Sequence, residues 1–192
     1  MVDFRGAPFQ EAGAQDFATR EINPVSENRE HSNSVDALSA NPVNRSHYAS
    51  GSHDHTIKVW DANTHRCVST IRGHTDGVWA LDYLTDGRKM ISASVDGTAR
   101  LWDVNSGQNT ATLAYHENKV YDAAVNQDMT MACTVSSDKK IAVWDLRNTQ
   151  QPMLVNSDDT RESVTCCDFS DDSKAVITAT FGGRVVVLDL ES

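Results

Sequence analysis

The feature that most constrains the fold is an internal repeat. The chain contains four similar segments: TIKVWDANT (56–64), TARLWDVNS (98–106), KIAVWDLRN (140–148) and RVVVLDLES (184–192). Their Trp–Asp pairs begin at Trp60, Trp102 and Trp144, and Leu188 takes the fourth place, so the steps are 42, 42 and 44 residues. A period of this length predicts stacked copies of one small supersecondary unit, each of which needs its neighbours to bury its apolar face.

Each unit is built from short runs that read as strands. Residues 56–60, Thr-Ile-Lys-Val-Trp, alternate with period two, and the runs are rich in β-branched and aromatic residues and bounded by Asn, Asp, Gly or Lys. Two further runs precede each Trp–Asp segment. A fourth run follows it in the first three copies, and the last copy has none before residue 192. Four antiparallel strands per unit predict an all-β fold made of β-propeller blades.

The period and the terminal Trp–Asp dipeptide resemble the WD40 repeat family. The resemblance implies about four blades, expected at 30–72, 73–114, 115–157 and 158–192. Residues 1–29 carry no repeat, and we expect an N-terminal arm or a closing strand there, with QDFATREIN (15–23) as the candidate strand.

The number of blades leaves the closure of the propeller open. An open row of blades exposes an apolar face at each end, and large exposed apolar patches favour association. Three arrangements are compatible with the sequence: a small four-bladed ring, a ring completed by a second chain, or a partial propeller that is a piece of a longer protein.

A serine, a histidine and an aspartate recur at fixed distances before each tryptophan, which invites comparison with a hydrolase triad. The resemblance instead implies buried structural tetrads, in which the indole N–H donates to the hydroxyl, the hydroxyl to the imidazole, and the imidazole to the aspartate. No Gly-x-Ser-x-Gly elbow surrounds the serines, and we expect no catalytic residues. The tetrad residues are His31, Ser50, Asp54, Trp60; His74, Ser92, Asp96, Trp102; and His116, Thr134, Asp138, Trp144.

The fourth copy departs from this pattern, because Thr160, Gly182 and Leu188 replace the histidine, aspartate and tryptophan and only Thr178 remains. We expect this blade to depend on apolar packing alone, through Val176, Ile177, Val185, Val186 and Val187. Either ordinary divergence or adaptation to a neighbouring chain accounts for the loss.

Composition narrows the class of partner. The formal net charge of −10 disfavours nucleic acid and favours a protein or peptide partner, with a basic one as the natural match. No apolar run is long enough for a membrane span, and no secretory signal begins the chain. Cys67, Cys133, Cys166 and Cys167 lack metal-type spacing, and we interpret them as reduced core thiols of a cytoplasmic or nuclear protein.

Two short motifs raise other functions. His47, His53 and His55 lie within nine residues, but no zinc-like ligand spacing accompanies them, and we expect no metal or cofactor. Trp144-Asp145-Leu146-Arg147 is similar to a box in WD40 substrate receptors of cullin ubiquitin ligases, in which the arginine contacts the adaptor. This makes Arg147 a possible adaptor contact, although an arginine after a strand is commonly just solvated.

The family resemblance implies that function resides on the top face of the propeller. Its surface positions flank the leading valine (or its equivalent) of the first strand and precede the turn aspartate. In the four copies these residues are Ser34, Asp36, His53; Gly77, Trp79, Val95; Lys119, Tyr121, Ser137; and Ser163, Thr165, Phe181. We expect a non-catalytic scaffold that binds partners here, with Trp79 and Tyr121 central, unless Trp79 instead packs as core between blades.

Overall fold

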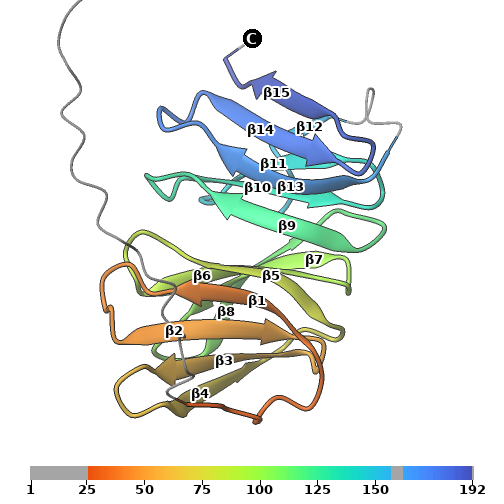
Figure 1. Ribbon diagram of the computed structural model, residues 1–192. Helices are drawn as coiled ribbons and strands as arrows, with labels where there is room; N and C mark the ends of the chain where they lie inside the picture. Colours follow the sequence, from red (N-terminus) through yellow and green to blue (C-terminus); the bar gives the residue numbers. More distant parts are fainter. Residues whose placement is uncertain (1–25, 157–161, 192) are drawn as a thin grey trace, which may run out of the picture.

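The computed structural model describes residues 26–156 and 162–191, and Figure 1 shows that these form four antiparallel sheets in an open row. Within the described ranges there are strands and turns, and no helix has the length and apolar character that a membrane crossing requires. The predicted all-β fold of about four antiparallel blades is confirmed, and the described blades form an unclosed row. The candidate strand at 15–23 lies outside the described residues.

The sheets follow the repeat, and each is a meander of consecutive strands. The first contains β1 (Val35–Ala40), β2 (His47–Ser52), β3 (Thr56–Asp61) and β4 (Arg66–Arg72). The second contains β5 (Val78–Tyr83), β6 (Lys89–Ser94), β7 (Thr98–Asp103) and β8 (Gln108–Ala114). The third contains β9 (Val120–Val125), β10 (Met131–Ser136), β11 (Ile141–Asp145) and β12 (Leu154–Asn156). The fourth contains β13 (Val164–Phe169), β14 (Ala175–Thr180) and β15 (Val185–Asp189).

The core lies between neighbouring sheets rather than within one. Ile57 and Ile71 of the first sheet pack with Trp102 of the second, and Leu101 of the second packs with Trp144 of the third. The third and fourth sheets share a cluster that includes Val143 and Val176. Each sheet therefore depends on a neighbour to cover its apolar face, as the repeat period predicts.

Two expectations about buried residues were wrong. In the fourth sheet Val176 is buried, but Ile177, Val185 and Val187 are exposed, because no sheet follows on their face within the described residues. Cys133 and Cys167 are core thiols, whereas Cys166 is exposed and Cys67 is half-buried. Cys166 and Cys167 point to opposite faces of β13, as neighbouring strand residues do.

Candidate functional site

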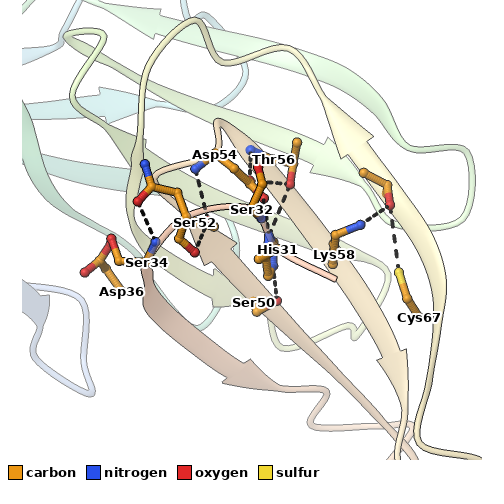
Figure 2. Close-up of polar contacts among 12 residues, drawn as sticks. His31, Ser32, Ser34, Asp36, Ser50, Ser52, Asp54, Thr56, Lys58 and Cys67 are labelled. Atoms are coloured by element: carbon orange, nitrogen blue, oxygen red, sulfur yellow. Dashed lines mark hydrogen bonds and ion pairs between the residues drawn. The ribbon is translucent and has the colours of Figure 1, made fainter. Parts of the chain in front are cut away.

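The first tetrad is a continuous chain of hydrogen bonds in the first sheet. Trp60 Nε1 donates to Ser50 Oγ at 2.8 Å, and Ser50 Oγ lies 2.7 Å from His31 Nε2. His31 Nδ1 lies 2.8 Å from Asp54 Oδ2, and Figure 2 shows how this carboxylate also holds the turn through Thr56. An ionised aspartate only accepts, so the imidazole carries its proton on Nδ1 and accepts the serine proton on Nε2.

The second and third sheets repeat the same chain. Trp102 Nε1 donates to Ser92 Oγ at 2.8 Å, and His74 lies 2.7 Å from that oxygen and 2.8 Å from Asp96. In the third sheet the corresponding contacts join Trp144 to Thr134 at 3.0 Å, Thr134 to His116 at 2.8 Å and His116 to Asp138 at 3.0 Å.

Burial and hydrogen bonding set the charge state of these groups. Burial lowers the pKa of His74 and of His116, more than the neighbouring aspartates raise it, so both imidazoles are neutral at pH 7. Burial alone would raise the pKa of Asp96, but hydrogen bonds from His74 and Thr98 lower it far below its usual range. Neutral imidazole beside a carboxylate satisfies every polar atom of the tetrad.

The tetrad hydroxyls are already engaged in hydrogen bonds, although Ser50 and His31 also line a hollow of about 470 Å³ on the first sheet. Ser50, Ser92 and Thr134 are buried, and each oxygen already accepts from an indole and contacts an imidazole. A nucleophilic serine needs an open approach and an adjacent oxyanion hole. This arrangement therefore suits a role in holding each sheet together better than catalysis.

The fourth sheet has lost its tetrad and carries the resulting defects. Thr178 Oγ1 is buried without a hydrogen-bond partner among the described residues, because Leu188 offers no N–H donor. A cavity of about 100 Å³ lies beside Leu188, between β11, β12 and β15, and Asn156 Oδ1 in its lining is also unpartnered within the described part of the chain. Thr160, aligned with the tetrad histidines, lies outside the described residues.

A second set of positions is aimed at one end of the sheets by β-bulges. The register of the first strand pair in each sheet shifts at one residue, and that residue is Asp36, Trp79, Tyr121 or Thr165. A bulge leaves one extra residue unpaired and redirects its side chain. The predicted top-face positions on the first strands are therefore the bulged residues themselves.

The remaining top-face positions are fixed by one repeated backbone hydrogen bond. In each sheet, the residue that follows the second strand donates its N–H to the carbonyl of the residue directly before the first strand. The pairs are His53–Ser34 at 2.9 Å, Val95–Gly77 at 2.9 Å, Ser137–Lys119 at 3.0 Å and Phe181–Ser163 at 3.1 Å. All twelve predicted positions thus share one local geometry at the same end of every sheet.

Four of these side chains form a continuous aromatic row across the sheets. His53 and Trp79 have ring centroids 5.4 Å apart, Trp79 and Tyr121 5.5 Å, and Tyr121 and Phe181 5.7 Å, each with edge-to-face geometry. We call His53, Trp79, Tyr121 and Phe181 the aromatic row. Trp79 is 37% exposed and Phe181 is more exposed still, whereas the three tetrad tryptophans are buried. Trp79 is therefore a half-exposed surface residue, not part of the core.

Carboxylates stand at both ends of the aromatic row. At one end His53 Nε2 lies 3.3 Å from Asp36 Oδ2, and His55 Nε2 lies 3.8 Å from Asp76 Oδ1. At the other end Thr180 Oγ1 donates to Glu162 Oε2 at 3.3 Å, next to Phe181. The row thus offers π faces and edges between two acidic ends, which suits apolar and cationic side chains.

Asp36 is the predicted top-face residue whose side chain contacts the row, through His53, and the other predicted side chains lie around it. Thr165 Oγ1 donates to the carbonyl of Ala179, so its hydroxyl is used within its own sheet. Val95 is half-buried, and Lys119 is exposed. Sequence reasoning also missed Asp76 and Glu162. Their signal was present, because Asn33, Asp76, Asn118 and Glu162 take the same place in the four copies.

Arg147 lies apart from the aromatic row, directly after β11. Its Nε and Nη2 donate to Asp145 at 2.9 and 2.7 Å, and this pairing lowers the pKa of Asp145 to about 2. The guanidinium is exposed at the mouth of a hollow of about 310 Å³ that Leu84, Met129 and Leu146 also line.

The described residues contain no group of three histidine, cysteine or acidic side chains placed to hold a metal ion. His53 and His55, two of the three clustered histidines, each face an aspartate instead.

Comparisons with known proteins agree with this architecture. The family described as WD domain, G-beta repeat matches residues 22–61, 65–103, 107–145 and 153–189. A 41-residue stretch is 51% identical to the ribosome biogenesis protein YTM1 of Scheffersomyces stipitis, covering 21% of this chain and 9% of that protein. Another 41-residue stretch is 46% identical to an F-box protein of Saccharomyces cerevisiae, covering 21% of this chain and 6% of that protein.

A third relative is the uncharacterized WD repeat-containing protein C126.01c of Schizosaccharomyces pombe. It is 46% identical over 48 residues, which is 25% of this chain and 13% of the relative. The chain thus spans at most 13% of the length of these three relatives.

Proposed function

Because the chain belongs to the WD40 repeat family, we propose that it is a non-catalytic scaffold that binds extended segments of partner proteins across its aromatic row. WD repeats indicate a protein-interaction scaffold in general, and the aromatic row is the observation that carries the specific proposal. Three ring contacts of 5.4–5.7 Å join side chains from all four sheets into one partly exposed surface. Exposed aromatic side chains clustered in this way are typical centres of binding energy.

The charges around the row define the chemistry of the partner. Asp36 and Asp76 lie at one end and Glu162 at the other, and the chain as a whole carries a net charge of −10. We expect a segment with an apolar or aromatic centre and lysine or arginine near its ends. Lys119 beside the middle of the row disfavours a basic centre, because like charges repel there. The same charge balance disfavours nucleic acid as a partner.

The test is selection of peptides from a random displayed library on the full chain, followed by affinity measurements on the variants Trp79→Ala and Tyr121→Ala. Each should weaken binding by about 1–3 kcal/mol, as truncation of an interface hot spot does, and leave thermal stability near wild type. Met153→Ala is the matched control, because Met153 is an exposed apolar residue before β12. Unchanged affinity together with a large loss of melting temperature in the row variants would refute the proposal.

A second candidate function uses a different feature, the exposed Arg147. Its guanidinium borders the 310 Å³ hollow, a shape that an adaptor side chain can enter. The relative named as an F-box protein supports a ubiquitin-ligase substrate receptor, although only 6% of that protein is covered. Pull-down with wild type and Arg147→Ala separates the two: loss of ligase adaptors in the variant supports the receptor, and an unchanged set of partners rejects it. A cytoplasmic or nuclear location stays a prediction under either function.

A further inference from the structure

The three interfaces inside the chain follow one rule. Each sheet presents a trailing face, which contains the residues one and three before the Trp position on the third strand. The next sheet covers it with a leading face, which contains residues of its first strand together with the Trp position itself. Val59 and Ile57 of the first sheet, for example, meet Leu81 and Trp102 of the second. The same positions meet in the two later interfaces.

No described sheet covers the leading face of the first sheet. Leu38 of β1 aligns with Leu81 of β5, since each pairs with the tetrad serine of its own sheet. Leu38 is 71% exposed, but Leu81 is 7% exposed. Val35 is likewise exposed where its counterpart Val78 is buried. A hollow of about 470 Å³ opens on this face, lined by Val35, Leu38, Tyr48 and Trp60 and, from the segment before β1, by polar residues that include Arg29.

The trailing face of the fourth sheet likewise has no sheet over it among residues 26–156 and 162–191. Val185 and Val187 take the places that Ile141 and Val143 hold in the third sheet, three and one residues before the Trp position. Val185 is 71% exposed, whereas Ile141 is 1% exposed. Val187 is also exposed, and Val143 is buried.

We propose that two copies of this chain associate head to tail, the trailing face of each fourth sheet covering the leading face of the other copy's first sheet. The three internal interfaces show what kind of surface covers each face, and a second copy supplies both kinds at once. Figure 1 shows that the two faces lie at opposite ends of the row. The proposal requires each row of four sheets to turn through half a circle, so that two copies related by a two-fold axis form both contacts and close into a ring of eight sheets.

The exposed residues that align with buried interface positions are apolar, which suits a blade of the same type as the occupant. Val35, Leu38, Ile177, Val185 and Val187 are all uncharged and apolar, and all are exposed. Exposed apolar area of this kind is costly in water and is removed by contact with another apolar surface. Further blades of a longer chain would use the same positions, and they are a competing outcome of the test.

The test measures the mass of the full 192-residue chain by light scattering during size-exclusion chromatography, for wild type and for Leu38→Glu and Val187→Glu. Both substitutions lie at exposed positions, and Val43→Glu in the β1–β2 turn is the matched control. Circular dichroism melting confirms that each variant folds; Val185→Glu replaces any Val187→Glu protein that does not. We expect wild type and the control at twice the chain mass and each face variant at half that value.

Mixing the two face variants distinguishes a head-to-tail pair from any other dimer. In a mixed pair one contact carries both substitutions and the other carries neither, so the mixture should recover the mass of two chains. A folded wild-type monomer at all concentrations would overturn the proposal. So would a dimer that resists both substitutions, or a mixture of variants that stays monomeric.

Discussion

Replacing Leu188 with tryptophan should restore a tetrad-like contact in the fourth sheet and stabilise it. Leu188 aligns with Trp60, Trp102 and Trp144, and a cavity of about 100 Å³ lies beside it, with room for part of a larger side chain. Thr178 Oγ1 lies buried without a partner in the described part of the chain, at the position where Ser92 accepts from Trp102. The substitution supplies both the missing volume and the missing N–H donor.

The size of the effect follows from two gains, the filled volume and the new hydrogen bond, and from one cost, the strain of fitting a larger ring. The cavity of about 100 Å³ opens to solvent beside the exposed Leu154 and Val155, so filling it is worth about 1 kcal/mol, less than the roughly 24 cal/mol per Å³ of a sealed cavity. Satisfying a buried hydroxyl adds about 1–3 kcal/mol. Imperfect fit of the larger ring costs about 1–3 kcal/mol. We therefore expect the free energy of unfolding to rise by about 1 kcal/mol.

The assay is urea unfolding of wild type, Leu188→Trp and Leu188→Phe, each with and without Thr178→Val. Phenylalanine fills space but cannot donate, so the Trp variant should exceed the Phe variant by about 1 kcal/mol, the net worth of one hydrogen bond. Thr178→Val should abolish that difference, because it removes the acceptor. The reasoning is refuted if Leu188→Trp and Leu188→Phe have equal stability, or if their difference survives Thr178→Val.

Three further outcomes follow from the described contacts. Trp102→Phe and Ser92→Ala should each lower the free energy of unfolding by about 1–3 kcal/mol in urea titrations without changing peptide affinity. A Ser92→Ala protein that keeps wild-type stability but no longer binds the peptide would contradict a structural tetrad. Because the pKa values of His74 and His116 are lowered in the folded protein, these histidines take up protons in the unfolded chain first as the pH falls. Their contribution to stability should be full above pH ~6.5 and fall below it by at most about 1.4 kcal/mol per pH unit for each histidine. Urea midpoints that do not change between neutral pH and the onset of aspartate titration would contradict this. Cys166 should react with a maleimide in the folded protein and Cys167 only on unfolding, since Cys167 is buried and its pKa is raised. Mass spectrometry that finds both cysteines labelled equally fast would contradict the assigned faces of β13.

The repeat made much of the fold predictable from sequence. A tryptophan that recurs with a serine ten residues before it and an aspartate six residues before it needs an acceptor, and the hydrogen bond of Trp102 to Ser92 satisfies that need. Local spacing therefore predicts the strand order, the turns and the residue types in each tetrad.

Burial of the fourth sheet could not be predicted in the same way. Val185 and Val187 are as apolar as their counterparts in the third sheet, but burial depends on whether another sheet follows, which no local pattern contains. The contact of Tyr121 with Phe181 could not be predicted from local sequence either. It joins residues 60 positions apart in sequence, and it depends on where bulges aim side chains after the sheets have packed.

Trp79 itself provides the most direct measurement of the central claim, that partner segments bind across the aromatic row. It is the exposed tryptophan, while Trp60, Trp102 and Trp144 are buried, so acrylamide quenching of the intrinsic fluorescence reports mainly on the row. A library-selected peptide titrated into the full chain should protect the fluorescence with a saturation curve that matches its affinity, and the protection should vanish in Trp79→Phe. A peptide that binds with the same affinity to wild type and Trp79→Ala while quenching stays unchanged would contradict the claim.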